Sequence, residues 1–161
     1  MRIFNPRQTI IVTTRGSAEV LGKKVQKDNA ITLDWHTPLS FDPFLYCICI
    51  GKTRFSLQIL RESKVFCVNF MDLKHKDIVL YCGRNSGRHV DKFESSKIIK
   101  EECEKIDCPR IDQAVGYLEC EIINEIENGD HILFIGKVLK QEQKEGQRIF
   151  HLDANDFGTV N

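Results

Sequence analysis

Hydrophobic positions along the first third of the chain fall into runs of strand length. Residues 10–14 are rich in β-branched side chains, residues 29–35 alternate weakly between apolar and polar, and residues 45–50 are almost entirely apolar. Alternating and β-branched segments of this length are typical of strands, and a continuous apolar run is typical of a strand buried on both faces. We therefore predict three strands in this part of the chain.

The rest of the chain repeats the pattern and ends in two longer segments. Residues 65–70 form an apolar run, residues 115–126 alternate over a long span, and residues 131–140 open with a strongly apolar stretch. The pair Asn128-Gly129 is a strong hairpin signal between the last two segments. A further short strand is predicted over residues 148–152, which brings the total to six or seven strands.

Helical patterns are short and lie in the middle of the chain. Phe55, Ile59 and Leu60 form a narrow apolar stripe that predicts a helix within residues 52–63, and Asp72 is placed to cap a second helix that reaches Tyr81. Two prolines within residues 37–43 predict a fixed loop there. Because regular helices do not separate the strands, we predict a small antiparallel barrel with helical insertions.

The composition fits one globular domain over residues 1–161. Hydrophobic residues make up 42% of the chain and charged residues 29%, which is a soluble balance. No apolar run approaches the roughly 18 residues that a membrane span needs, and no signal peptide is evident at the N-terminus. We expect a cytoplasmic protein that does not associate with membranes.

The net charge is zero, but the two ends of the chain differ. Residues 1–100 hold 17 basic and 9 acidic side chains, whereas residues 101–161 hold 6 and 14. This distribution argues against a uniform basic surface, so we expect no nucleic-acid partner. A local basic patch for one anionic ligand and two solvated faces of opposite sign both fit the pattern.

Seven cysteines occur, and several lie inside apolar runs. The number is odd, no secretion signal accompanies them, and no CxxC spacing is present. These features favour free thiols in a reducing compartment and no metal site. Cys103 and Cys108 differ from the others because they flank an acidic, exposed-looking loop.

Polar groups concentrate where the apolar run at residues 45–50 meets the predicted helix. Lys52, Thr53, Arg54 and Ser56 follow Gly51 within one turn. Free N–H groups at a helix start, together with these cations and hydroxyls, predict a seat for a monophosphate. Helix capping with a solvated basic face is the alternative. The spacing of a Walker loop is absent.

Three other places carry candidate chemistry. The proline-fixed loop at residues 37–43 could aim backbone N–H groups at a ligand, or simply connect strands. Residues 83–93 contain two glycines and four basic side chains, which suits a mobile rim facing an anion as well as a solvated loop. His131, after the Asn-Gly turn, is either structural or part of a site, and a Cys49–His131 nucleophilic pair rests on residue types alone.

Five segments in register resemble the flavin reductase-like family, which includes flavoredoxin and FMN-binding split-barrel proteins. They are NAITLDWHTPLSFDP, CIGKTRFS, RESKVFCVNF, YCGRNSGRHVDKF and LECEI…NGDHILFIGKV, and the similarity runs from about Gln8 to Leu139. The resemblance implies a six-stranded antiparallel Greek-key split β-barrel that forms a homodimer. It also implies tightly bound FMN, with NAD(P)H as a possible co-substrate.

The resemblance assigns site residues by motif. The segment at residues 37–42 would hold the edge of the isoalloxazine ring, the basic segment after Gly51 would meet the phosphate, and His131 would orient groups near the ring. The cofactor-binding residues expected are Thr32, Trp35, Thr37, Ser40, Phe41, Cys49, Ile50, Gly51, Lys52, Arg54, Ser56, Ser86, Gly87 and Lys92.

Two departures from the family pattern bear on nicotinamide access. The chain ends soon after the expected barrel, without the longer tail of some relatives, and Phe55 stands where many relatives have Tyr or His. The predicted function is an FMN-binding, NAD(P)H-dependent flavin reductase that passes electrons to an acceptor such as a redox protein. The alternatives are a flavoredoxin-like electron carrier without its own NAD(P)H site and a barrel that binds a ligand other than flavin.

Overall fold

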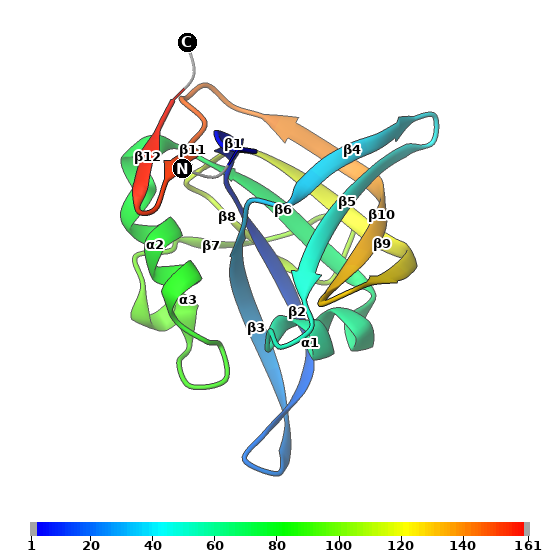
Figure 1. Ribbon diagram of the computed structural model, residues 1–161. Helices are drawn as coiled ribbons and strands as arrows, with labels where there is room; N and C mark the ends of the chain where they lie inside the picture. The colour runs from blue at the N-terminus through cyan, green and yellow to red at the C-terminus, as the bar shows by residue number, and fades with distance from the viewer. Residues whose placement is uncertain (1–2, 160–161) are drawn as a thin grey trace.

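The computed structural model describes residues 3–159, and its centre is a seven-stranded antiparallel sheet with the strand order β3-β2-β6-β9-β10-β5-β4 (Figure 1). The two outer strands, β3 and β4, are joined by residues 34–35 alone, so the sheet must curl. The Cys49 N–H donates to the Trp35 carbonyl at 2.9 Å, which ties this connection to β5. The sheet comprises β2 (Ile10–Val20), β3 (Lys23–Leu33), β4 (His36–Phe41), β5 (Phe44–Gly51), β6 (Val65–Met71), β9 (Ala114–Asn128) and β10 (His131–Gln143).

The inside of the curled sheet is the main core. Strand alternation points Ile48 and Ile50 of β5, Phe66 of β6 and Phe134 of β10 into it, and all four are fully buried. The outer face of β2 and β3 buries a second cluster, which includes Ile78 of α2. The prediction of a mainly β, antiparallel fold is confirmed.

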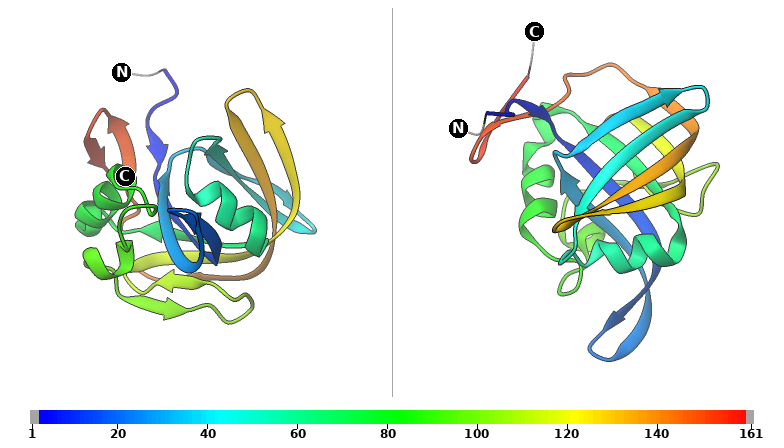
Figure 2. Two further views of the ribbon diagram at one scale, coloured as in Figure 1. Left: turned by 90° about the horizontal axis from the view of Figure 1, so that it is seen from below. Right: turned by 45° about the vertical axis from the view of Figure 1, so that its right-hand side comes forward.

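Short helices cover two parts of the sheet. Helix α1 (Ser56–Ser63) packs on β2 and lies across one end of the sheet (Figure 2). The 3-10 helix η1 (Leu73–His75), α2 (Lys76–Arg84) and α3 (Lys92–Ser95) lie against β3. The Asp72 carboxylate accepts the Lys74 N–H at 3.0 Å and caps this segment, as predicted. No helix among residues 3–159 is long and apolar enough to cross a membrane.

Smaller strands complete the fold. A three-stranded sheet joins β1 (Arg7–Gln8), β11 (Phe150–Asp153) and β12 (Asp156–Gly158), and β7 (Lys100–Glu102) pairs with β8 (Pro109–Ile111). The β7–β8 pair lies within a polar stretch in which the sequence pattern predicted no strand. Pro109 and Ile111 of β8 are buried, and this burial stabilises the pair.

The prediction of a fixed loop at residues 37–43 is wrong, because most of this segment is strand β4. Pro38 pairs with Tyr46 in the β4–β5 register, and the chain reverses at Asp42-Pro43. A proline is tolerated here because β4 is the last strand of the sheet and needs no N–H donor on its outer side. Counting β4, the main sheet has seven strands, whereas the resemblance implied six.

Candidate functional site

A cavity of about 530 Å³ opens where β3 and β5 end beside the loop between α2 and α3. We call it the Trp35 pocket. Its walls come from the end of β3, the end of β5, the segment leading into α1, the carboxyl end of α2, and single residues of α3 and β10. It is lined by Ile31, Thr32, Leu33, Asp34, Trp35, Cys49, Gly51, Thr53, Arg54, Phe55, Ser56, Cys82, Gly83, Arg84, Asn85, Ser86, Gly87, Lys92 and His131.

One wall of the pocket is aromatic. The rings of Trp35 and His131 lie 4.6 Å apart between centroids with an interplanar angle of 32°. His131 is the first residue of β10 and pairs with Gly51. Its Nδ1 lies 2.6 Å from a carboxylate oxygen of Asp130, which can only accept, so Nδ1 carries a proton. The pair with His131 also lowers the pKa of Asp130.

Another wall is cationic. The buried Lys92 donates from Nζ to the carbonyl oxygens of Ala30 and Cys82, both at 2.7 Å, which leaves its third N–H uncommitted. Burial lowers the pKa of Lys92 to about 8; nearby Cys82 opposes this shift, while Arg54 and Lys27 add to it. Within residues 3–159, neither Lys92 nor Arg54 has a carboxylate at ion-pair distance.

These walls define what the pocket can bind. Its volume lies within the ~300–1,000 Å³ typical of small-molecule sites. A flat aromatic wall favours a planar ring, and a desolvated ammonium and a guanidinium without acidic partners favour an anion such as phosphate. Asp34 is the single acidic residue of the lining. The arrangement therefore suits a ligand with a planar part and an anionic part.

The structure brings most of the expected site residues together. Trp35, His131, Arg54 and Lys92 form the two walls described above. The others of this group that line the pocket are Thr32, Cys49, Gly51, Ser56, Ser86 and Gly87.

Five expected residues lie outside the pocket, for three reasons. Ile50 alternates with Cys49 and Gly51 along β5, so its side chain faces the core and is fully buried. Lys52 turns away to an ion pair with Glu127 on β9. Strand β4 runs away from the pocket along β5, with 96% of Phe41 exposed near its tip. This course carries Thr37, Ser40 and Phe41 out of the lining.

Ser56 occupies the pocket wall but is already engaged. It is 3% exposed, and its Oγ accepts the side-chain N–H of the buried Asn29 at 2.7 Å. Fewer side chains of the segment after Gly51 are thus available to an anion than the sequence predicted. Arg54 is the only cation of that segment that lines the pocket.

Sequence reasoning missed several pocket residues. Asp34 precedes Trp35, and its carboxylate accepts from Thr9 Oγ1 at 2.7 Å and lies 2.5 Å from Nδ1 of His151. Burial opposes the charged form of His151, but the bond to Asp34 outweighs it and raises the pKa of His151. The sequence feature that could have pointed to Asp34 is its position directly before Trp35. Cys82 belongs to α2, and no local pattern linked it to the site.

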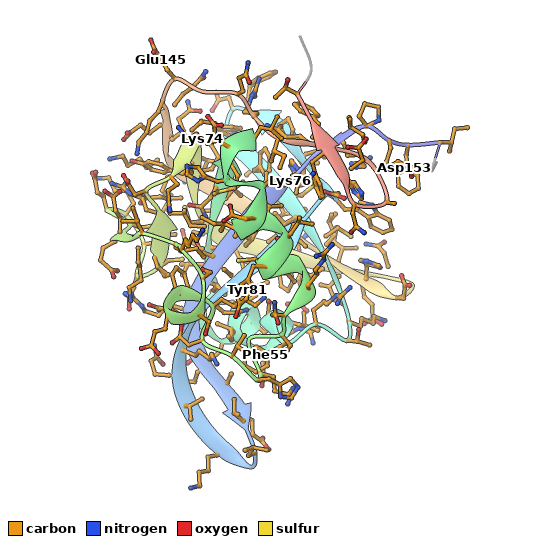
Figure 3. The ribbon with its side chains drawn as sticks, turned by 90° about the vertical axis from the view of Figure 1, so that its left-hand side faces the viewer. Phe55, Lys74, Lys76, Tyr81, Glu145 and Asp153 are labelled. Atoms are coloured by element: carbon orange, nitrogen blue, oxygen red, sulfur yellow. The ribbon has the colours of Figure 1, made fainter. Side chains whose placement is uncertain are left out.

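A second, more open hollow adjoins the Trp35 pocket along α1. It measures about 1090 Å³ and shares Thr53, Arg54 and Phe55 with the pocket. Phe55 lies below the end of α2 that carries Tyr81 (Figure 3). Within the described chain, no group of three or more His, Cys, Asp or Glu side chains is placed to hold a metal ion.

Comparison with known proteins identifies the family of the chain. The family model described as "Flavin reductase like domain" matches residues 1–155. An uncharacterized protein of Archaeoglobus fulgidus is 35% identical over 115 residues, which are 71% of this chain and 65% of that protein. The chain thus spans slightly less than two thirds of this relative. An NADH-dependent FAD reductase of Streptomyces globisporus is 29% identical over 140 residues, 86% of this chain and 71% of that protein.

Solved structures agree with this assignment. An FMN-binding protein from Thermus thermophilus with bound p-hydroxybenzaldehyde has a TM-score of 0.83 at 24% identity, over 99% of this chain and 89% of that chain. The NADH:FAD oxidoreductase of Streptomyces globisporus in complex with NAD and FAD fragments has a TM-score of 0.82 at 25% identity, over 98% and 87% of the two chains.

Proposed function

Because the chain belongs to the flavin reductase-like family, we propose that it binds FMN in the Trp35 pocket and reduces it with NADH or NADPH. One observation supports this most strongly. The pocket combines the stacked Trp35–His131 wall with two cations, Arg54 and Lys92, that no carboxylate of residues 3–159 neutralises. This combination matches a flavin mononucleotide, which carries a planar ring system and a terminal phosphate.

The phosphate belongs at the cationic wall in this proposal. Arg54 supplies a guanidinium, and Lys92 directs its uncommitted N–H from a buried position. Ser86 and Gly87 add a hydroxyl and backbone at the loop. Charge-assisted hydrogen bonds to phosphate are stronger than neutral ones, and a desolvated site increases the difference. This wall therefore supplies much of the affinity and the preference for FMN over riboflavin.

The ring system belongs beside Trp35 and His131. Bound FMN would supply hydride acceptance and the release of electrons singly or in pairs. The protein orients the ring through the Trp35 face and the end of β5 at Cys49 and Gly51. His131 keeps a proton at Nδ1 through Asp130, so its Nε2 is the atom that can accept a hydrogen bond from a ligand. A hydride step needs no acid or base, so His131 has an orienting role.

The experiment that tests this function is anaerobic rapid mixing of the FMN-loaded protein with NADH and, separately, with NADPH. We expect the visible absorbance of the flavin to bleach faster than that of free FMN with at least one donor. If the protein retains FMN but shows no such bleaching, the proposed reductase activity is contradicted and a flavoredoxin-like electron carrier is favoured. Failure to retain FMN would favour a barrel for another ligand.

The proposal also includes a homodimer, a cytoplasmic location and an electron acceptor that is either a small molecule or a redox protein. The odd number of cysteines and the lack of a CxxC spacing support a reducing compartment. The relative described as an NADH-dependent FAD reductase supports NADH as the donor and leaves FAD as a second flavin to compare with FMN.

The affinity for FMN is expected to fall as the pH rises above about 8. Lys92 has a pKa of about 8, so it is charged below this pH and loses its charge above it, while the phosphate stays anionic. Riboflavin lacks the phosphate and should show no such fall. Titrations of both flavins below and above this pH measure the effect. Lys92→Met should flatten the FMN profile, and an unchanged profile in that variant would contradict the assignment.

A further inference from the structure

Three cysteines gather outside the lining of the proposed flavin site. Cys67 on β6, Cys108 directly before β8 and Cys103 directly after β7 belong to one packed cluster with Tyr117. Cys67 and Cys108 are fully buried, whereas Cys103 is partly exposed. All seven cysteines of the protein are free thiols, so the cluster is in its reduced form.

Cys103 and Cys108 are neighbours across two antiparallel strands. Glu102 pairs with Pro109 at the end of the β7–β8 ladder, so Cys103 and Cys108 are the residues that continue from this last pair into the loop. The Cys103 N–H donates to the Cys108 carbonyl at 3.0 Å. Directly opposed residues of an antiparallel pair have Cβ atoms about 4.5–5.5 Å apart, close to the ~3.5–4.5 Å that a disulfide spans. A small movement is therefore enough to join them.

The loop between the two cysteines is held in place by a buried carboxylate. Glu119 is 0% exposed and lies opposite Cys67 in the β6–β9 register. Its oxygens accept the N–H of Glu104 at 3.0 and 3.1 Å and the N–H of Lys105 at 2.6 Å. These bonds fix the backbone directly after Cys103 and so hold its thiol at the partly exposed side of the cluster.

The environment also favours the reactive form of Cys103. Hydrogen bonding with Cys108 and then with Cys67 lowers the pKa of the Cys103 thiol; burial opposes this shift, and nearby Arg110 adds to it. Burial raises the pKa of Cys108, which therefore keeps its proton. The cluster thus pairs a partly exposed thiol of lowered pKa with a buried thiol, which is the arrangement of an attacking and a resolving cysteine.

We propose that Cys103 and Cys108 form a disulfide when the protein meets hydrogen peroxide. The Cys103 sulfur attacks one peroxide oxygen, so an S–O bond forms, the O–O bond breaks and hydroxide leaves. The Cys108 sulfur then attacks Cys103, so the S–S bond forms and the S–O bond breaks. The departing oxygen and the hydroxide take up the two thiol protons. One peroxide and two thiols give one disulfide and two waters. This inference does not depend on flavin binding.

Trypsin offers a direct test, because cleavage after Lys105 separates the two cysteines. The native protein is treated with an equimolar amount of peroxide, its remaining thiols are blocked with N-ethylmaleimide, and it is digested without reductant. We expect residues 101–105 and 106–110 to appear as one linked species lighter by two hydrogens, and as separate peptides after reduction. Recovery of Cys103 as a blocked thiol, or as a sulfinic acid without a link, overturns the proposal.

Variants distinguish the partners within the cluster. A link between residues 101–105 and residues 65–74 would assign Cys67 in place of Cys108 and would also overturn the proposal. Cys103→Ser, at a partly exposed position, should abolish the link. Cys47→Ala is the matched control, because Cys47 lies on β5 outside the cluster, and the link should persist in it. Its loss in Cys47→Ala would contradict the assignment.

Discussion

Arg54→Ala is expected to weaken FMN binding by roughly 10- to 150-fold, or about 1.5–3 kcal/mol, the range for a charge-assisted hydrogen bond to phosphate. Arg54 is the cation of the segment after Gly51 that lines the Trp35 pocket, and it has no carboxylate partner within the described residues. The affinity for riboflavin should barely change, because riboflavin has no phosphate. Titration of both flavins into the apoprotein measures the difference.

Arg61→Ala is the matched control for Arg54. Arg61 lies on α1, outside the Trp35 pocket, and pairs with Glu125 at 2.8 Å on a partly exposed surface. Exposed pairs of this kind contribute little, so neither flavin should lose affinity. Equal losses for FMN and riboflavin in Arg54→Ala would show that Arg54 does not contact the phosphate.

Gly51→Leu is expected to abolish flavin binding while leaving the protein folded. A Cβ at Gly51 would meet Cγ of Arg54 at 3.6 Å and Nε2 of His131 at 3.7 Å, which are ordinary contacts. The rest of a leucine side chain would then extend into the space between the cationic and aromatic walls, where the ligand is proposed to lie. We expect affinity to fall by more than about 100-fold, corresponding to roughly 3 kcal/mol.

Gly51→Ala separates this blocking effect from damage to the strand. Alanine adds only the Cβ that the site accommodates, so its thermal unfolding should resemble that of the wild type, and it should still bind FMN. Circular dichroism and thermal unfolding establish the fold of both variants. A Gly51→Leu protein that is folded and binds FMN with wild-type affinity would place the cofactor elsewhere.

The hydrophobic pattern predicted the inner strands of the sheet because burial decides them. Residues 45–50 and 65–70 are apolar since both belong to strands with a neighbour on either side that face the main core, and the pair Asn128-Gly129 marks the β9–β10 hairpin. The prediction failed where secondary structure depends on whether a strand lies at the edge of the sheet or inside it. Pro38 usually ends a strand, but at the edge of a sheet it removes only a hydrogen bond that no neighbour would make.

The β2–β3 hairpin shows a second limit. Its turn places Leu21 at φ 51° and Gly22 at φ 75°. Leucine rarely adopts a positive φ, so its presence in the sequence does not indicate a turn. The sheet on either side imposes this conformation. Leu21 lies at the tip of the hairpin and is 95% exposed, so no packing pattern marks it either.

The residues of the candidate site also fall into those that the sequence predicted correctly and those that it did not. Trp35, Arg54 and His131 stand next to strand ends, where sequence position and spatial position agree. Ile50 lies one residue from two pocket residues, but strand alternation turns it into the core. The partner of Lys52 could not be foreseen, since Glu127 lies on β9, far along the chain. Contacts between distant segments thus decide which of several adjacent polar residues face the pocket.

The central claim is that a flavin lies against Trp35, and the fluorescence of this residue tests it directly. Trp35 is the only tryptophan of the chain and forms part of the aromatic wall. FMN is titrated into the apoprotein, and the emission is corrected for absorption by the flavin. We predict saturable quenching that ends at one FMN per chain. Binding of FMN that leaves the Trp35 emission unchanged, or no binding at all, would contradict the account.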